Sequence, residues 1–252
     1  PLFFQIDNYG VRDWDQQLFY YGSVLKTVFE YGQLPLWNPW YCGGSVLFQH
    51  PLVPIVSPVY LLEPILGLLL AMKLTIAIHY GLALFGMILI ARKIYRISNI
   101  FSIILASTMF MFSSYLSLRV AEGHWWVLTA AYIPFIFLGY ELYLSQKHIG
   151  WLFFGAAVFA LIVWSGGIYP APLMALFLCG YAFLRAIIEK DSTPIRALFL
   201  LGGYAVILSA PKLIPIADYM LEYPRIAMDR EYIPPAVWFD IFLGREQSIS
   251  ID

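Results

Sequence analysis

Long apolar runs separated by short polar connections dominate this chain. A membrane-spanning helix needs about 20 apolar residues, within a working range of roughly 17 to 25. Several runs meet that requirement and none of them contains a block of charges. We therefore predict six transmembrane helices, at residues 72–92, 100–117, 126–143, 150–166, 171–188 and 196–215.

The connections between these segments alternate in charge. The second has Arg119 as its only Lys or Arg, and the fourth, SGGIYPAP, has none. The others are basic and carry Arg92, Lys93 and Arg96 (first), Lys147 and His148 (third), and Arg185, Lys190 and Arg196 (fifth). Because cytoplasmic loops are enriched in Lys and Arg, we predict that the odd connections are cytoplasmic. Residues 1–50, the loops around Arg119 and Ser165, and the tail at 216–252 are then external.

Residues 51–71 interrupt this pattern. The segment is apolar, but it contains three prolines before residue 60, then Glu63, Pro64 and Gly67. If this segment crossed the membrane, residues 1–50 and the loop around Arg119 could not both be external. The orientation predicted from the basic loops would then conflict with an external first loop. We therefore predict a broken, re-entrant or interfacial segment, whose backbone must be satisfied by protein or by a watery cavity.

The composition supports a lipid environment. The chain is 61% hydrophobic and 12% charged, about half of the ~25% charged residues that are usual in soluble domains. These values predict an all-α, multi-pass membrane protein. The net charge of −1 and the scattered basic residues argue against a nucleic-acid partner.

The ends of the sequence predict a longer chain. It begins at Pro1 without Met or a signal peptide and stops in a polar run. We expect at least one more span before Pro1, and we interpret residues 216–252 as the start of an external segment.

Carboxylates gather on the external side. All acidic residues except Glu141, Glu189 and Asp191 belong to it or to the broken segment, and Asp7, Asp13 and Asp15 form the densest group. An amphipathic helix is predicted at 13–33, with its apolar stripe of Trp14, Leu18, Tyr21, Leu25 and Val28 on the membrane surface. Asp13 begins this helix and shares a face with Gln17. From the residues alone, a helix cap is the favoured role of Asp13.

Two other external segments have the composition of a binding site. The run PLWNP, with Trp37 and Asn38, is followed by paired glycines and predicts a fixed loop that anchors in the interface or stacks on a sugar. Arg119, Glu122 and His124 form a compact charged loop backed by two tryptophans. His79, alone on an apolar helix, is interpreted as a packing residue.

Several of these motifs, taken in order, resemble one enzyme family. Asp13 and Gln17, GQLPLWNPWYCGG at 32–44, IHYGLALFGMILIARKIY, GHWWVLTAAYIPF, SGGIYP and LSAPKLIP are similar to the YfhO-like branch of the GT-C glycosyltransferase superfamily. The resemblance implies a GT-C-like helical bundle in the plasma membrane. It also implies an inverting enzyme that moves a sugar from a polyprenyl-phosphate donor to a glycan, lipid or protein acceptor on the non-cytoplasmic face.

The same resemblance implies a role for one residue. An Asp in the first external loop acts as the catalytic base, which matches Asp13, with Asp15 as the alternative. From their predicted external positions, and not from the resemblance, we expect Gln17, Trp37, Asn38 and Glu122 to bind substrate and the external cations Arg119, His124 and Lys212 to bind the donor phosphate. No cofactor is implied, although a DxD-like metal role for the two aspartates stays open. The alternatives are a transporter or flippase, since broken helices also mark transport sites, and a non-catalytic subunit with the same fold.

Overall fold

The computed structural model describes residues 13–224, so Asp7 and most of the predicted C-terminal external segment lie outside the described residues. About 75% of these residues are helical, and the stretch 31–58 is the longest without a helix. The elements are α1 (Trp14–Leu25), a π-helical turn (Lys26–Glu30), β1 (Trp37–Asn38), β2 (Ser45–Val46), α2 (Val59–Leu66), α3 (Leu68–Lys93), α4 (Ile100–Met111), α5 (Ser114–Ala121), a 3₁₀-helix (Trp125–Tyr132), α6 (Ile133–Gln146), α7 (Gly150–Trp164), α8 (Pro170–Glu189) and α9 (Thr193–Glu222).

Five helical segments are long and apolar enough to cross a membrane. They are Leu68–Lys93, Ile100–Ala121, Trp125–Gln146, Pro170–Glu189 and Thr193–Glu222. The all-α, multi-pass membrane class is therefore confirmed. The remaining predicted span is α7, which has 15 residues and a length of about 22 Å at 1.5 Å per residue. That is shorter than the ~30 Å hydrocarbon core and than the other five segments, so the crossing by α7 stays a prediction.

Two of the long segments are not continuous α-helices. The chain leaves helical geometry at Ser113, whose φ and ψ are −55° and 142°, so α4 and α5 are separate helices within one apolar segment. The segment that ends with α6 begins with a 3₁₀-helix. Apolar length alone predicts neither irregularity, because it reports total hydrophobicity and not local backbone geometry.

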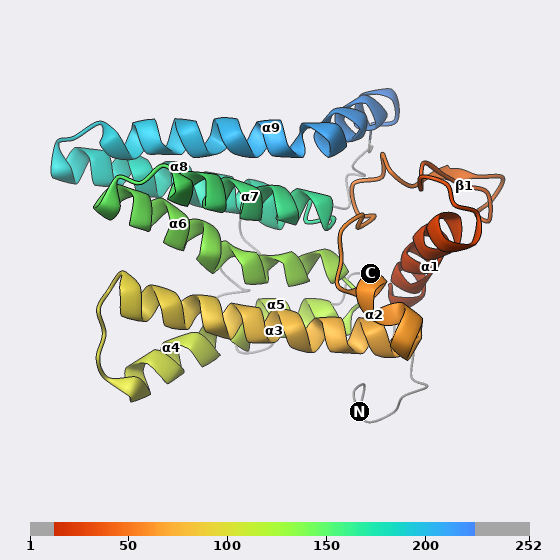
Figure 1. Cartoon of the computed structure of the whole chain (residues 1–252), viewed down its shortest axis with the longest axis horizontal. Coiled ribbons are helices and arrows are strands. Elements are labelled where there is room, and N and C mark those ends of the chain that lie inside the picture. The colour runs from red at the N-terminus through yellow and green to blue at the C-terminus, as the bar shows by residue number, and fades with distance from the viewer. Residues whose placement is uncertain (1–12, 225–252) are drawn as a thin grey trace, which may run out of the picture. The chain divides into compact units, whose positions relative to one another are not determined.

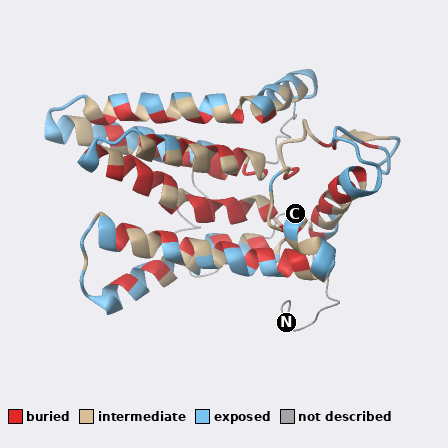
Figure 2. Ribbon diagram, viewed as in Figure 1, coloured by how far each residue is buried: buried red, intermediate tan, exposed pale blue. Residues whose placement is uncertain are grey.

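The helices run beside one another and return at each connection (Figure 1). The connections after α3, α6 and α8 gather at one end, and α1 and β1 lie at the other. The first group contains the basic loops, as the predicted topology requires. Within the bundle the segment that ends with α6 is the most covered, with 83% of its apolar window buried, against 17% for α8 (Figure 2). The outer helices therefore expose large apolar side chains, which suits contact with lipid.

The first helix differs from its prediction. It ends by Glu30, and most of its apolar stripe is covered by protein instead of lying on a membrane surface, although Val28 is 38% exposed. Trp14, Tyr21 and Leu25 are buried, and Tyr21 packs edge-on against Trp125 with 5.5 Å between ring centroids. The hydrophobic periodicity indicated an apolar face correctly, but periodicity does not distinguish lipid from protein as the partner of that face.

The segment at 51–71 is irregular up to Pro58 and then forms α2, which Gly67 separates from α3. Its backbone is satisfied by the end of α7. The amides of Ile55 and Val56 donate to the Trp164 carbonyl at 2.8 and 3.2 Å, and the Ser165 hydroxyl donates to the Val56 carbonyl at 2.9 Å. Irregular backbone at this depth is therefore paired within the protein.

Candidate functional site

The start of α1 lies against the turn that joins α5 to the 3₁₀-helix. The Asp13 amide donates to the Glu122 carbonyl at 3.2 Å, and the Trp14 indole N–H donates to the Val120 carbonyl at 3.1 Å. The Trp14 and Trp125 rings meet edge to face, with centroids 5.4 Å apart. These contacts join two segments more than 100 residues apart and hold the first residue of the described chain in register with the charged loop.

Gly123 is required at this junction for two reasons. Its φ is +87°, a conformation that residues with a Cβ rarely adopt. A Cβ at this position would also lie 2.5 Å from the backbone nitrogen of Trp14 and 2.6 Å from the carbonyl carbon of Asp13. The glycine therefore allows the two backbones to approach closely enough for the flanking side chains to meet.

Four charged or titratable side chains converge here, which we call the Asp13 cluster: Asp13, Arg119, Glu122 and His124. Asp13 Oδ2 lies 3.1 Å from His124 Nε2. Arg119 Nη1 lies 3.1 Å from Glu122 Oε2 and 3.3 Å from His124 Nδ1. All four were predicted from the sequence as site residues, and they lie within one contact network.

The network indicates how the imidazole is oriented. A guanidinium only donates hydrogen bonds, so Nδ1 of His124 accepts from Arg119 in the neutral imidazole. Nε2 then carries the hydrogen and donates it to Asp13. Both ring nitrogens are occupied in this arrangement, whereas Asp13 Oδ1 has no hydrogen-bonding partner among the described residues.

Asp13 is not a side-chain cap of α1. Its carboxylate makes no capping hydrogen bond to the helix, contrary to the role that the residues alone favoured. Its side chain keeps 49% of its exposure and that of Arg119 keeps 42%, so both are accessible to a ligand. Asp15 is exposed, and its Oδ1 accepts from the Gln16 amide at 2.8 Å. Two residues correspond to about 200° of helical rotation, which directs the two carboxylates to different sides.

Aromatic rings extend the cluster on one side. The ring of Trp126 is stacked on His124 with 5.8 Å between centroids and lies 4.6 Å from the ring of Tyr169. Tyr169 belongs to the SGGIYP loop before α8 and is 43% exposed. Sequence reasoning did not select Trp126 and Tyr169 as site residues. The available signal was that Trp126 begins the predicted span 126–143 at its external end and Tyr169 belongs to the fourth connection, on the same predicted side of the membrane.

An apolar groove of about 560 Å³ begins beside the cluster. It shares α5 with the cluster, because Val120 and Ala121 line the groove and the neighbouring Arg119 and Glu122 belong to the cluster. Across the groove lie Tyr80 on α3 and Phe112 at the end of α4. A charged end and an apolar channel on one helix suit an amphipathic ligand.

The other predicted site residues have different environments. Gln17 is buried within α1, one turn after Asp13. Trp37 pairs with Val46 in the small antiparallel ribbon and is 52% exposed, with Gly44 packed on its indole. Asn38 is fully buried, and its Oδ1 accepts from the Trp40 amide at 3.0 Å. The PLWNP loop is thus held by its own short-range contacts.

Lys212 was predicted as an available cation on the external side for the donor phosphate, and its burial is a correction to that availability. Its side chain on α9 is fully buried. The ammonium donates to the carbonyls of Phe48 and His50, the latter at 3.3 Å, and lies 5.1 Å from the centroid of the Phe48 ring. Lys212 therefore anchors the loop before the broken segment. The sequence could not show this, because its partners are backbone atoms more than 160 residues away.

The DxD-like pattern was the one metal-binding possibility that the sequence left open. Within residues 13–224, no group of three or more His, Cys, Asp or Glu side chains is arranged to hold a metal ion. The two aspartates of the DxD-like pattern also point to different sides of α1.

The resemblance to YfhO-like enzymes rests on the sequence motifs alone. No protein-family model, no curated protein and no solved structure matches this chain. The resemblance to YfhO-like enzymes stays a prediction, and the chemistry considered below depends on the geometry of the Asp13 cluster and the groove beside it.

Proposed function

We propose that this chain forms an inverting membrane glycosyltransferase site that transfers a sugar from a polyprenyl-phosphate donor to an acceptor hydroxyl on the external face. The observation that carries the proposal is the Asp13 cluster. One carboxylate oxygen is held by His124, the other has no partner in the described chain, and an accessible guanidinium lies in the same network. The motif resemblance supplies the substrate class.

The reaction assigned to this site needs one base and no strong acid. Asp13 Oδ1 takes the proton of the acceptor hydroxyl as that oxygen attacks the anomeric carbon from the face opposite the phosphate. The bond between the anomeric carbon and the phosphate oxygen breaks, and the phosphate leaves with the electron pair. Inversion follows from this single displacement. A positioned general base of this kind contributes about 10² to 10⁴ in rate.

Arg119 is the proposed partner of the departing phosphate. Only Nη1 takes part in its hydrogen bonds to Glu122 and His124, so the other donors of the guanidinium are available for a fork-like contact. Glu122 is a positioning residue, because it holds Arg119 from the other side. The rings of Trp126 and Tyr169 offer a surface for the sugar, and the groove along α5 suits the start of the lipid tail.

The test compares two aspartates on one helix. Purified full-length protein in vesicles is given undecaprenyl phosphate that carries a tritiated hexose, with a membrane extract as the source of acceptors. Asp13→Asn keeps the shape of the side chain but removes the base, so transfer is expected to fall by about 10² to 10⁴. Asp15→Asn is the matched control and should stay within about twofold. Wild-type turnover by a folded Asp13→Asn variant would refute the assignment.

A further inference from the structure

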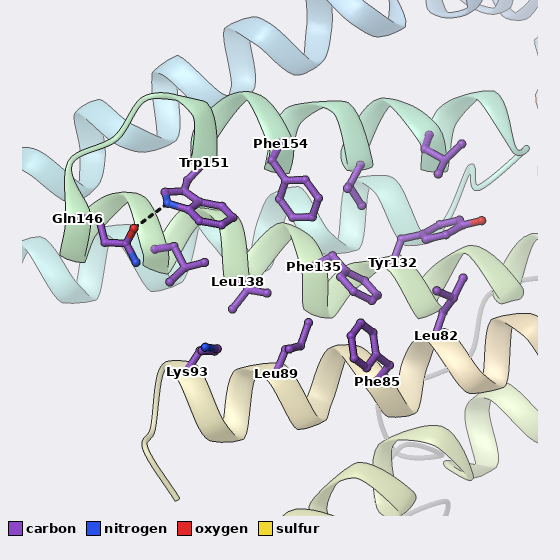
Figure 3. A pocket seen from close by; sticks show the side chains of 13 residues that line it. Leu82, Phe85, Leu89, Lys93, Tyr132, Phe135, Leu138, Gln146, Trp151 and Phe154 are labelled. Carbon is purple, nitrogen blue, oxygen red and sulfur yellow. Dashed lines mark hydrogen bonds between the residues drawn. The ribbon is translucent and has the colours of Figure 1, made fainter.

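A second apolar groove, of about 590 Å³, lies at the other end of the bundle between α3, α6 and α7. Its walls are leucines and aromatic rings, among them Phe85, Leu89, Leu138 and Phe154. Figure 3 shows these side chains facing one another across the gap, with Lys93, Gln146 and Trp151 at one end and Leu82 and Tyr132 at the other. The groove is therefore long and largely apolar, and its charged side chain, Lys93, lies at one end.

The length of the groove matches one leaflet of a bilayer. Lys93 and Leu82 lie on the same helix and are 93 − 82 = 11 residues apart. At 1.5 Å per residue, this separation is about 16 Å. Half of a ~30 Å hydrocarbon core is about 15 Å. A chain in the groove would thus extend from the headgroup level to roughly the middle of the membrane.

The polar end of the groove is basic. Arg92, Lys93 and Arg96 lie at or just beyond it, and Lys93 has no ion pair with any described residue. The acidic side chains at this end of the bundle are already compensated by arginines. Arg185 pairs with Glu141 and Glu189, and Arg196 lies 4.0 Å from Asp191.

Trp151 marks the headgroup level at this end. Its indole N–H donates to Gln146 Oε1 at 2.9 Å, while its ring lines the apolar part of the groove (Figure 3). Tryptophan is enriched at this depth in membrane proteins because one part of the ring is apolar and the other is a hydrogen-bond donor. Lys93 and Trp151 therefore face the position that a lipid phosphate would occupy.

We propose that this groove binds one acyl chain of an anionic phospholipid from the leaflet at the basic end, with its phosphate at Lys93. By the positive-inside rule this is the cytoplasmic leaflet. The site is separate from the Asp13 cluster and does not depend on the proposed sugar transfer. The apolar walls select a hydrocarbon chain, and the unpaired cation selects a negative headgroup.

Quenching of Trp151 fluorescence tests the proposal. The full-length protein is reconstituted in vesicles with brominated phosphatidylglycerol or with phosphatidylcholine that carries the same brominated chains. The difference between wild type and Trp151→Phe isolates the emission of Trp151. One basic residue near an anionic headgroup contributes about 1 kcal/mol to the free energy of lipid binding. Brominated phosphatidylglycerol should therefore quench half of the Trp151 emission at a mole fraction roughly fivefold lower than brominated phosphatidylcholine requires.

Two sets of controls distinguish a specific site from general lipid contact. Lys93→Gln should abolish the preference, whereas Lys190→Gln, another basic residue at this end outside the groove, should keep it. In the Trp151→Phe background, Phe153→Trp reports from another face of α7 and should show no headgroup preference. Equal quenching of Trp151 by both lipids, or a preference that survives Lys93→Gln, would overturn the proposal.

Mass spectrometry of the intact protein provides a second measurement that needs no tryptophan substitution. Wild-type protein purified from phosphatidylglycerol-containing vesicles is expected to retain about one such lipid, and Lys93→Gln should retain about fivefold less. Equal retention by the two proteins would contradict a headgroup contact at Lys93.

Discussion

The Asp13 cluster and Lys212 both place charged groups against the first fifty residues, but the environments of these groups differ. Arg119 and Asp13 keep 42% and 49% of their side-chain exposure, and each has hydrogen-bonding capacity that the described residues do not use. Lys212 is fully buried, and its ammonium is held by the carbonyls of Phe48 and His50. An ammonium that is buried against backbone carbonyls holds two segments of the fold together, whereas a charge that is positioned but accessible can contact a ligand.

The cost of burial explains the difference. Removing an ammonium from water is expensive unless hydrogen bonds replace the lost hydration. Lys212 recovers part of this cost through two carbonyls and the face of the Phe48 ring. The Asp13 cluster keeps much of its hydration, so its members need fewer partners. The four predictions that follow test whether Lys212 has a structural role and the Asp13 cluster a functional one.

The largest expected effect is on stability. Lys212→Met keeps the volume of the side chain but leaves two part-buried carbonyls without their donor, at about 1 to 3 kcal/mol each at most. We expect the free energy of unfolding to fall by about 2 to 4 kcal/mol, measured by thermal unfolding in detergent. Lys190→Met, at an exposed lysine, is the control and should change it by less than about 0.5 kcal/mol. An unchanged free energy of unfolding in Lys212→Met would contradict a structural role for Lys212.

A substitution at Gly123 tests the geometry of the other site. In Gly123→Ala the new Cβ would collide with the backbone of Asp13 and Trp14, so Asp13 must move away from His124. A displacement of about 1 Å at a reacting group costs roughly a hundredfold in rate. Sugar transfer should therefore fall about a hundredfold. Gly180→Ala, on a helix with open space around the Cβ, is the control, and equal activity of the two variants would contradict a positioned base.

Acid should destabilise the Lys212 region through His50. Burial, and then the charge of Lys212, lowers the pKa of His50 to about 4. The unfolded imidazole has a pKa of about 6.5 and binds protons first as the pH falls, so this contribution is present above about pH 6.5 and is lost towards pH 4. The loss should reach about 2 kcal/mol by pH 5, measured as the unfolding free energy against pH. The same decline in His50→Asn would assign it to another group.

The smallest expected effect separates a guanidinium from a simple positive charge. Arg119→Lys keeps the charge but loses the planar fork, so the KM for the polyprenyl-phosphate donor should rise about tenfold with little change in stability. The measurement is donor-dependent transfer by the variant and by Arg92→Lys, a matched change at the opposite end of the bundle. A KM that changes equally in both variants would argue against a phosphate contact at Arg119.

The sequence predicted the charged residues of the candidate site, but it missed two aromatic residues beside them and included Lys212. Arg119, Glu122 and His124 are close in sequence, so their grouping was visible, and the resemblance connected them with Asp13. Trp126 and Tyr169 were missed because ring contacts between separate loops leave no periodic signal. Lys212 was misassigned for a related reason. A lysine near the end of an apolar helix looks exposed unless the carbonyls that accept its hydrogen bonds are known.

By itself, the sequence determined the membrane class, the approximate positions of the helices and the alternation of basic connections, because hydrophobic length and loop charge act locally along the chain. Only the tertiary structure decided that the stripe of α1 faces protein, that Asp13 meets His124, and that Lys212 is buried. Each of these depends on contacts between segments about 100 or more residues apart, and such contacts follow from packing, which no local pattern encodes.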